Sequence, residues 1–429
     1  MSELSYLEKL LDGVEVKWLP LGNVAEIYGG LTGKSKSDFE NGNARYVSYK
    51  KIFGYLDVND YPTDYVYISE GERQNKVRYG DVLFTGSSEI ADEAGMSSAV
   101  TVHFEESVYL NSFSFGIRFS NSIKIKPEFA KYLFRTHFMR SEIAKTASGV
   151  TRFNISKSRF KKILVPIICP NDPEKSLAIQ SEIVRILDKF TALTAELTAE
   201  LTAELNMRKK QYNYYRDQLL SFKEGEVEWK TLEEVLVDKF WIMPATPKFD
   251  DNGEIPYITS KNISGGNIDF ERVKHISRDD FLSISKNRPI LKGDFLISMI
   301  GTIGEIARVK CLDPDFYGQN MYLIRLNEEL LHPRYFLHFF DSPRMKFYFK
   351  SVKNNSGQGY LKANNIDGLS IPLPSIDEQQ KIAFILDKFD TLTNSITEGL
   401  PREIELRQKQ YEYYRDLLFS FPKPETVSN

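Results

Sequence analysis

Two short blocks of sequence occur twice in the chain at one constant spacing. The first block, Ile-Leu-Asp-Lys-Phe, begins at Ile186 and again at Ile385. The second, Gln-Tyr-x-Tyr-Tyr-Arg-Asp, begins at Gln211 and again at Gln410, so both are displaced by the same 199 residues. An equal displacement means that the chain carries one long element twice. This duplication constrains the fold more than any other feature.

The segments before each copy of this element are also related, but more distantly. Residues 46–52 resemble residues 257–263, and residues 80–84 resemble residues 293–297, at displacements of 211 and 213. Two similar folds with different surfaces therefore alternate with two much more similar elements. The pattern is typical of a molecule that recognises two different things with its variable parts and holds two like partners with its constant parts.

Residues 177–222 have the apolar spacing of an amphipathic helix. Ile179, Ile183 and Ile186 begin a series that recurs at intervals of mainly three and four residues. About 46 residues at 1.5 Å each predict a rod of roughly 70 Å, and such a rod needs a partner for its apolar stripe. The second copy is the obvious partner, although Pro401 should kink or break it.

Three Leu-Thr-Ala-Glu units follow one another at residues 193–204 of the first copy, and Leu205 closes the run. Four residues turn a helix by about 400° and lengthen it by ~6 Å, so each unit acts as an increment of length. A solvated low-complexity helix is the alternative interpretation. The return of Leu at every fourth position favours a packed stripe.

The two variable regions, residues 14–170 and 227–375, read as short β-rich runs broken by Gly, Asn and Asp. A helix is expected within each region, at residues 127–146 and at residues 333–352. The sequence therefore predicts an α+β fold in which two β-rich regions alternate with two long helices.

The beginning of the chain repeats the end of the long element. Residues 6–11 resemble residues 215–220, so the chain opens with the last turns of the segment that closes each repeat. The two halves are therefore expected head to tail with approximate two-fold symmetry, and the two termini are expected to lie close together.

The composition is that of a globular protein in a reducing compartment. Of 429 residues, 41% are hydrophobic and 13% aromatic, which excludes a disordered chain. Only Cys169 and Cys311 are present, so a disulfide framework is not expected. No secretion signal opens the chain, and no apolar run reaches the ~18 residues of a membrane span. We expect a cytoplasmic protein without membrane contact.

The net charge of −3 does not by itself favour nucleic-acid binding, which usually relies on a basic surface. The charges are unevenly distributed, however, and basic residues crowd the first variable region. They are Lys34, Lys36, Arg45, Lys50, Lys51, Arg73, Lys76 and Arg78. A local basic face is therefore available, and partner proteins would supply further positive charge.

No motif of an enzyme is present. There is no Asn-Pro-Pro-Tyr or Asp-Pro-Pro-Tyr block for methylation of an extruded base, and no glycine fingerprint for a dinucleotide-like cofactor. Residues 29–35 resemble a phosphate-binding loop, but Tyr28 stands where its first Gly is required, so a tight turn is the better interpretation. The five histidines show no metal-ligand spacing with the cysteines. Catalysis is expected to come from partners.

Each variable region closes with a glycine-containing loop. Residues 148–155 read Ser-Gly-Val-Thr-Arg-Phe-Asn-Ile, and residues 356–362 read Ser-Gly-Gln-Gly-Tyr-Leu-Lys. Such loops approach a phosphate backbone closely and present forked donors to base edges. A simple turn is the alternative interpretation of both.

The organisation as a whole resembles the specificity subunits of type I restriction-modification enzymes, of the IC subgroup. The resemblance rests on the paired variable regions, the two similar helices, the Leu-Thr-Ala-Glu units and the tail at residues 410–421, and it spans essentially the whole chain. It implies two target recognition domains, each reading one half of a split, asymmetric site in double-stranded DNA, separated by two long antiparallel helices in a pseudo-two-fold repeat. The helices would space the half-sites and bind two methyltransferase subunits, and restriction subunits would join later.

The resemblance also implies a division of the chain and of the chemistry. The recognition domains would be residues 1–173 and 224–375, and the spacer helices residues 174–223 and 376–429. No cofactor is expected on this chain, whereas S-adenosylmethionine, ATP and Mg would bind to partner subunits. The chain would thus be a non-catalytic subunit of an adenine-DNA methyltransferase and restriction endonuclease.

Candidate DNA contacts are the residues of the paired motifs and of the two glycine loops. In the first region they are Ser48, Tyr49, Lys50, Lys51, Gly149, Thr151, Arg152 and Asn154. In the second they are Thr259, Ser260, Lys261, Asn262, Gly357, Gln358, Tyr360 and Lys362. Two other functions stay open at this point: a free-standing DNA-binding regulator and a structural helical adaptor with no nucleic-acid role. Tight binding to a specific duplex without partners would favour the regulator, and no DNA crosslinking in the complex would favour the adaptor.

Overall fold

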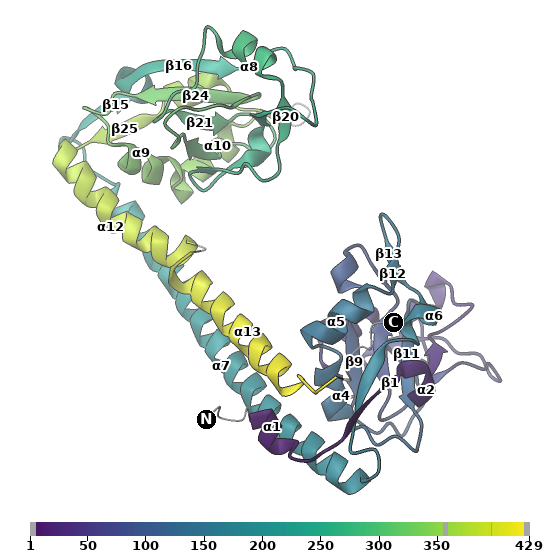
Figure 1. Cartoon of the computed structure of the whole chain (residues 1–429). Coiled ribbons are helices and arrows are strands. Elements are labelled where there is room, and N and C mark those ends of the chain that lie inside the picture. The colour runs from purple at the N-terminus through teal and green to yellow at the C-terminus, as the bar shows by residue number, and fades with distance from the viewer. Residues whose placement is uncertain (1–5, 355–358, 396, 424–429) are drawn as a thin grey trace. The chain divides into compact units, whose positions relative to one another are not determined.

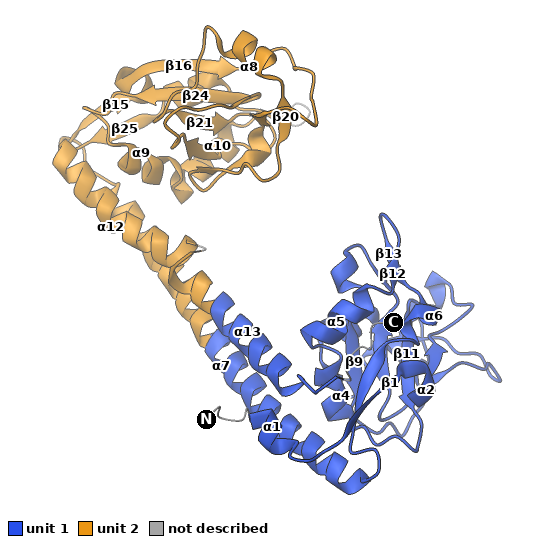
Figure 2. Ribbon diagram, in the orientation of Figure 1, with its two compact units in different colours: residues 1–199, 405–429 blue, residues 200–404 orange. Residues whose placement is uncertain are grey.

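The computed structural model describes residues 6–354, 359–395 and 397–423. The chain divides into two compact units (Figure 2), residues 1–199 with 405–429 as unit 1 and residues 200–404 as unit 2. Each unit combines a β-rich head with segments of long helices (Figure 1). The prediction of an α+β fold with two β-rich regions and long paired helices is confirmed.

The head of unit 1 contains two main sheets. One has the strand order β2-β11-β7-β9-β4 and the other β5-β3-β10-β6, while β12-β13-β8 and β1-β14 form smaller sheets. The strands are β1 (Val16–Pro20), β2 (Ala25–Gly29), β3 (Ala44–Val47), β4 (Asp57–Val58), β5 (Asp64–Val66), β6 (Lys76–Val77), β7 (Val82–Thr85), β8 (Ser87–Ser88), β9 (Ser97–Val100), β10 (Val108–Leu110), β11 (Ser114–Phe119), β12 (Ala147–Ser148), β13 (Phe153–Ile155) and β14 (Leu164–Ile168). Most pairs are antiparallel, but β3 pairs with β10, and β4 with β9, in parallel.

The head of unit 2 repeats this plan with shorter sheets. Its orders are β16-β24-β21-β22, β20-β17-β23, β15-β25 and β18-β19, and β17 pairs with β23 in parallel as β3 does with β10. The strands are β15 (Glu228–Thr231), β16 (Leu236–Ile242), β17 (Ile255–Ile258), β18 (Ile263–Ser264), β19 (Asn267–Ile268), β20 (Lys274–Ile276), β21 (Phe295–Ser298), β22 (Ile306–Arg308), β23 (Tyr317–Gly318), β24 (Met321–Leu326) and β25 (Ser370–Leu373).

A buried ion pair explains the duplicated Gly-Asp motif. Asp294 is fully buried before β21, and Arg325 on β24 donates to both of its oxygens at 2.7 and 2.9 Å. Asp81 and Arg118 form the same pair in unit 1 at 2.7 and 2.6 Å. In both units the aspartate also accepts a backbone N–H three residues earlier, which closes the turn that the preceding glycine makes. The motif is therefore structural.

Short helices cover the sheets, and two pairs of them correct the predicted helix boundaries. The single helices expected at residues 127–146 and 333–352 are each two helices: α4 (Pro127–Leu133) with α5 (His137–Ala144), and α9 (Pro333–Phe340) with α10 (Pro343–Val352). The break has a local cause, because the hydroxyls of Thr136 and Ser342 each accept the N–H three residues on and cap the second helix. The other head helices are α2 (Leu21–Val24), α3 (Tyr49–Gly54), α6 (Lys157–Phe160), α8 (Arg278–Ser285) and α11 (Ala363–Asp367), with 3-10 turns η1 (Lys36–Phe39), η2 (Ala91–Glu93), η3 (Leu232–Val235) and η4 (Ser260–Asn262).

The first long helix, α7 (Pro173–Leu219), is uninterrupted over its 47 residues, as the periodicity predicts. In unit 1 its Phe190 stacks on Tyr414 of α13 (Gly399–Leu418), with ring centroids 5.3 Å apart. In unit 2 its Tyr215 stacks on Phe389 of α12 (Ile376–Asn394) at 5.4 Å. The same aromatic pair thus recurs with the roles of the helices exchanged, as the duplicated blocks require.

The second copy of the long element is two helices, α12 and α13. α12 ends at Asn394, and α13 begins at Gly399, whose φ of 80° lies in the left-handed region that glycine adopts without strain. The predicted interruption is therefore confirmed, but it lies before Pro401, which fits into the first turn of α13. Among the described residues, no helix is both long and apolar enough to cross a membrane.

Both ends of the described chain lie in unit 1. α1 (Tyr6–Leu10) packs on α7, where the Tyr6 hydroxyl donates to Glu182 at 2.8 Å. The segment after α13 packs on the head, where Phe419 contacts Phe129 and the Pro422 carbonyl accepts the Trp18 indole N–H at 2.8 Å. Both segments therefore belong to unit 1.

Candidate nucleic-acid interface

The parallel pair β3 and β10 brings two connecting segments of unit 1 to one edge. Because both strands run in the same direction, the segments that follow them, α3 and residues 111–113, leave the sheet at the same edge. Four predicted contacts, Ser48 to Lys51, lie at the start of α3, and Lys50 is exposed.

Ser87 connects these residues to the predicted glycine loop. Its carbonyl accepts the Tyr49 hydroxyl at 2.8 Å, and its hydroxyl accepts Nε–H of Arg152 at 3.0 Å. β8 also pairs with β13, where Asn154 lies opposite Ser87. The structure therefore brings together the two groups of candidate contacts that the sequence predicted for the first region.

The β12–β13 connection is a tight hairpin whose shape requires glycine. Gly149 has φ 145°, and a Cβ there would lie 1.9 Å from the carbonyl oxygen of Arg152. The hairpin projects Val150, Thr151 and Arg152 into solvent, and Val150 is 92% exposed. An apolar tip beside polar side chains is suited to insertion into a groove of DNA.

Sequence reasoning missed two further parts of this surface. Phe113, on the turn after β10, is 62% exposed although it is a large apolar residue. Exposed basic side chains follow the hairpin along and beyond α6: Lys157, Arg159, Lys161 and Lys162. Their close spacing in the sequence was the available signal. Phe113 had no signal of its own, because aromatic residues occur in strands and turns of any core.

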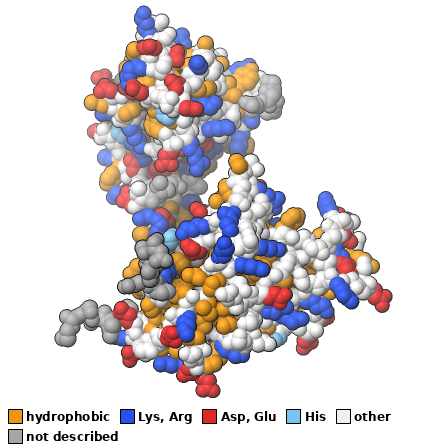
Figure 3. All heavy atoms as spheres, turned by 45° about the vertical axis from the view of Figure 1, so that its right-hand side comes forward, with side chains coloured by type: hydrophobic (Ala, Val, Ile, Leu, Met, Phe, Trp, Pro, Cys, Tyr) orange, Lys and Arg blue, Asp and Glu red, His pale blue; other side chains and the backbone are white. Residues whose placement is uncertain are grey.

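Some of the basic residues of the first region have a structural role. Lys34 pairs with Glu72 at 2.6 Å, a hydrogen bond that holds the pKa of that carboxyl at about 2. Arg45 donates to the Pro62 carbonyl and lies over two tyrosine rings. Lys and Arg side chains gather over part of the face of unit 1 that Figure 3 brings forward. A basic surface is thus present despite the net charge.

Arg135 positions α3 from beneath. It donates to the carbonyls of Ile52, Phe53 and Tyr55 at 3.1 to 3.2 Å and to that of Ser97 at 2.8 Å. Burial lowers the pKa of Arg135 to about 10, so it remains charged at neutral pH. One partly buried side chain thus fixes the end of the helix that carries Lys50 and Lys51.

Unit 2 brings its predicted residues together through another loop. The Thr302 hydroxyl, in the loop after β21, donates to the Ser260 carbonyl at 2.7 Å. The same loop contains Ile300, which bridges to Tyr360 of the second glycine loop. Lys261, next to Ser260, and Lys362, two residues after Tyr360, are both exposed. Gly357 and Gln358 lie outside the described residues.

The side chain of Asn262 has a structural role. It is 6% exposed, its oxygen accepts the Thr259 N–H at 2.9 Å, and its amide donates to the carbonyls of Asp269 and Arg272. The Thr259–Asn262 motif therefore shapes the loop on which Ser260 and Lys261 are displayed.

In each head the sixth residue of one helix is bonded to the Asp of the repeated Ile-Leu-Asp-Lys-Phe block. In unit 1 this residue is Tyr132 of α4, which donates to Asp188 at 2.7 Å and contacts Thr191 at 3.1 Å. In unit 2 it is His338 of α9, whose Nε2 lies 2.6 Å from Asp387 and whose Nδ1 lies 2.9 Å from the Tyr212 hydroxyl. The head and the long helices are thus joined at equivalent positions by different chemistry.

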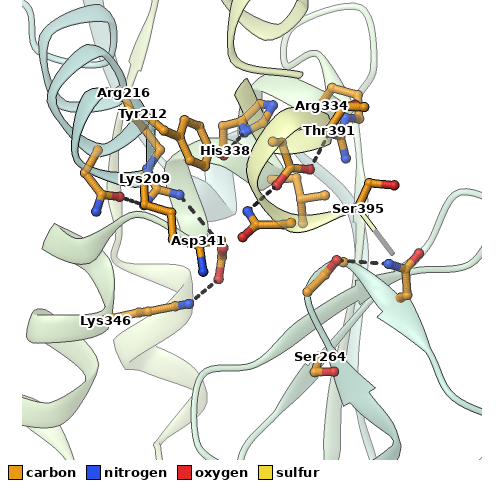
Figure 4. Close-up of a pocket in the computed structure, with 17 residues that line it drawn as sticks. Lys209, Tyr212, Arg216, Ser264, Arg334, His338, Asp341, Lys346, Thr391 and Ser395 are labelled. Atoms are coloured by element: carbon orange, nitrogen blue, oxygen red, sulfur yellow. Dashed lines mark hydrogen bonds and ion pairs between the residues drawn. The ribbon is translucent and has the colours of Figure 1, made fainter. Parts of the chain in front are cut away.

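The junction in unit 2 borders a cavity of about 810 Å³ (Figure 4). Lys209, Arg216 and Arg334 contribute positive charge, and Lys346 pairs with Asp341 at 2.7 Å. Asp387 is the helix-side partner in this junction. Burial acts to raise its pKa, but hydrogen bonds from His338 and Arg334 outweigh that effect and hold the pKa at about 2. Asp387 is therefore ionised throughout the physiological range.

The long helices expose the same apolar positions twice. Met207 and Leu406 are 47% and 42% exposed, and Tyr214 and Tyr413 are 61% and 63% exposed, each pair at the 199-residue displacement. The adjacent tyrosines, 215 and 414, make edge contacts with 214 and 413 at the same 5.4 Å. We call these sets the tyrosine surfaces of unit 2 (Met207, Tyr214, Tyr215) and unit 1 (Leu406, Tyr413, Tyr414). Exposed apolar groups of this kind are candidate interaction surfaces.

Comparison with known proteins places these features in one class. A family model described as "Type I restriction modification DNA specificity domain" matches residues 13–207 and again residues 225–406. The chain is 41% identical over 447 residues to the Type I restriction enzyme EcoR124I/EcoR124II specificity subunit of Escherichia coli, covering all of both chains. It is 37% identical over 404 residues to the EcoprrI specificity subunit of the same species, covering 93% of each.

The chain belongs to this family and is the DNA specificity subunit of a type I restriction-modification system. A solved structure described as the structural basis of complex assembly and conformational transition of the type I R-M system shares the fold, with a TM-score of 0.62, 16% identity and coverage of 94% of this chain and 97% of that one. As a specificity subunit the chain is itself non-catalytic and binds no cofactor; S-adenosylmethionine and ATP bind to the methyltransferase and restriction subunits. The chain is thus part of a complex that acts on DNA.

Proposed function

We propose that the heads of units 1 and 2 each read one half of a bipartite, asymmetric DNA site. The support is that each head carries the same loop arrangement with different side chains at its centre: Ser87 and Arg152 in unit 1, Thr302 and Tyr360 in unit 2. The candidates that are exposed and would contact DNA are Lys50, Thr151, Arg152, Asn154, Lys261 and Lys362, and the partly exposed candidates are Ser48, Tyr49, Lys51, Ser260 and Tyr360. Gly149 would let the hairpin approach the duplex.

The long helices set the distance between the half-sites and bind two methyltransferase subunits, one on each tyrosine surface. The observation that carries this stoichiometry is the twofold occurrence of equal exposure and equal ring geometry at Tyr214 and Tyr413. Restriction subunits would join the assembled methyltransferase in the cytoplasm. The recognition domains would be residues 1–173 and 224–375, with residues 174–223 and 376–429 as spacers, and the 41% identity to EcoR124I supports the IC subgroup.

Co-expression with the cognate methyltransferase tests the stoichiometry. Native mass spectrometry should give two methyltransferase copies per chain, and Tyr214→Asp or Tyr413→Asp should each remove one copy. Tyr67→Asp, a change of a similarly exposed tyrosine on the head of unit 1, should leave two. One copy on the unmodified chain, or two copies on both variants, would contradict the proposal.

Exchange of a recognition domain tests the reading function. Replacing residues 14–170 with the corresponding region of another family member should change one half-site and leave the other half-site and the spacer unchanged. Long-read methylation mapping of a host that expresses the hybrid complex measures all three. A change in both half-sites, or in neither, would refute independent reading.

A further inference from the structure

Arg152 is held at two points within the DNA-facing loops of unit 1. Its Nε–H donates to the buried Ser87 hydroxyl at 3.0 Å, and its guanidinium carbon lies 5.7 Å from the centre of the Phe113 ring. A hydrogen bond at one edge and an aromatic ring beside the group restrict its orientation.

The Phe113 ring is itself on a rigid turn. The Asn111 side-chain oxygen accepts the Phe113 N–H at 2.9 Å, and the Phe113 carbonyl accepts the Gly86 N–H at 2.8 Å. Gly86 permits this contact, because a Cβ there would lie 2.7 Å from the Phe113 oxygen. An exposed apolar ring on a turn fixed from both sides contributes nothing to the core and therefore serves the surface.

The outer edge of the Arg152 guanidinium is available. Within residues 6–354, 359–395 and 397–423, neither terminal nitrogen has a hydrogen-bond acceptor, and the side chain is exposed. With Nε engaged, the two terminal NH2 groups of this exposed side chain remain as a fork of donors. Guanine presents N7 and O6 in the major groove at the spacing that this fork matches.

We propose that Arg152 reads a guanine in the half-site recognised by unit 1, and that Phe113 and Ser87 are positioning residues that fix its plane. This inference rests on the proposed reading function of the heads. A phosphate contact needs no fixed plane, because phosphate oxygens accept from many directions, whereas base discrimination needs one.

The arrangement is particular to unit 1. By alignment of the duplicated strands, Ile300 in unit 2 takes the place of Ser87, and Asn320 takes the place of Phe113. Neither supplies the hydroxyl or the ring that holds Arg152. The half-site read by unit 2 therefore serves as an internal control in the same molecule.

The test uses the complete methyltransferase complex after methylation mapping has given its site. Methylation rates are measured on duplexes in which each base pair of both half-sites is replaced in turn. For the unmodified complex, replacing one particular guanine of the first half-site should lower the methylation rate about 10- to 100-fold. In the Arg152→Lys complex this penalty should fall below about fivefold, since lysine keeps the charge but loses the fork.

Two comparisons separate reading from general damage. Phe113→Leu should reduce the discrimination at the same base pair, whereas Phe113→Tyr, which keeps the ring, should retain it. Arg78→Lys is the matched control: Arg78 is exposed and follows β6 at the opposite edge of the β3–β10 sheet, so discrimination should not change. Base preferences in the second half-site should be the same in every variant.

Three results would overturn the inference. Unchanged preferences in Arg152→Lys would exclude a reading role. If Arg152→Ala lowered the methylation rate equally on all duplexes and reduced the salt dependence of binding by about one ion, Arg152 would be assigned to a phosphate contact. Equal effects of Phe113→Leu and Phe113→Tyr would remove the role of the ring. Failure of the broader reading function is distinguishable, because exchange of residues 14–170 would then leave the half-sites unchanged.

Discussion

Deleting one Leu-Thr-Ala-Glu unit should shorten the spacer between the two half-sites by one base pair, or by two at most. The structure gives the magnitude, because residues 193–204 lie inside the uninterrupted helix α7. Removing residues 197–200 shortens an α-helix by ~6 Å and rotates its two ends by about 40° relative to one another. Leu197, Leu201 and Leu205 are half-buried, and the deletion keeps a Leu at every fourth position.

The translation and the rotation correspond to different numbers of base pairs. For a helix parallel to the duplex, ~6 Å corresponds to about 1.8 base pairs at 3.4 Å each. A rotation of 40° corresponds to about 1.1 base pairs, since one turn of DNA contains 10 to 10.5. A head must stay aligned with its groove, so rotation is the stricter condition and favours one base pair. The gap between α12 and α13 is where the second copy can adjust.

Methylation mapping of a host that carries the deletion together with its partner subunits measures the spacer directly. Both half-site sequences should be unchanged, and insertion of a fourth unit should lengthen the spacer by the same step. Altered half-sites with a constant spacer would refute the reasoning. Substituting Ala for Glu196 and Glu200 is the matched control, since it changes the sequence of the repeat but not its length.

The remaining predictions concern stability. Asp294→Ala should destabilise unit 2 by about 3 kcal/mol in urea unfolding, because it strands the Arg325 charge, whereas Asp238→Ala, which removes the exposed partner of the same arginine, should cost less than about 1 kcal/mol. The folded-state pKa of Asp387 is lowered to about 2, so its ionised carboxylate stabilises the fold above the unfolded pKa of about 3.9, and this stabilisation is lost as pH falls from 4 to 2. The difference in unfolding free energy between the unmodified chain and Asp387→Asn should therefore be constant above about pH 5 and close below pH 4. A difference that does not depend on pH would contradict this. Arg135→Met leaves four carbonyls without their donor and should cost about 3 kcal/mol, with faster hydrogen exchange in α3 and no change in α8.

The long helices could be predicted from sequence because their information is periodic and local. The spacing from Ile179 onward specifies α7 to within a few residues of its observed ends. The split of α4 from α5 was missed because it depends on one capping hydroxyl, Thr136, within a run of helix-forming residues. The prediction of a single helix at residues 333–352 was wrong for the same reason, although Pro343 was a visible signal of a second helix start.

The candidate interface was predictable only in part. Arg152 and Tyr49 lie in motifs that can be read in the sequence, but their meeting point, Ser87, is an ordinary serine whose role depends on strand pairing. The position of the Phe113 turn at the same sheet edge as α3 follows from the parallel pairing of β3 with β10, a long-range contact that no local pattern encodes. Conversely, Asn262 looked like a donor for DNA and instead completes the internal bonding of its loop.

The bond between each head and the long helices sets a simple compatibility rule for exchanging heads. The acceptor on the helix side is the same aspartate in both units, while the head supplies a phenol in one case and an imidazole in the other. A foreign recognition domain therefore needs a hydrogen-bonding side chain at the sixth position of its corresponding helix to reproduce this bond, in addition to apolar side chains that pack on the long helices. Under the proposed reading function, such an exchange would change the DNA specificity and leave the methylating subunits unchanged.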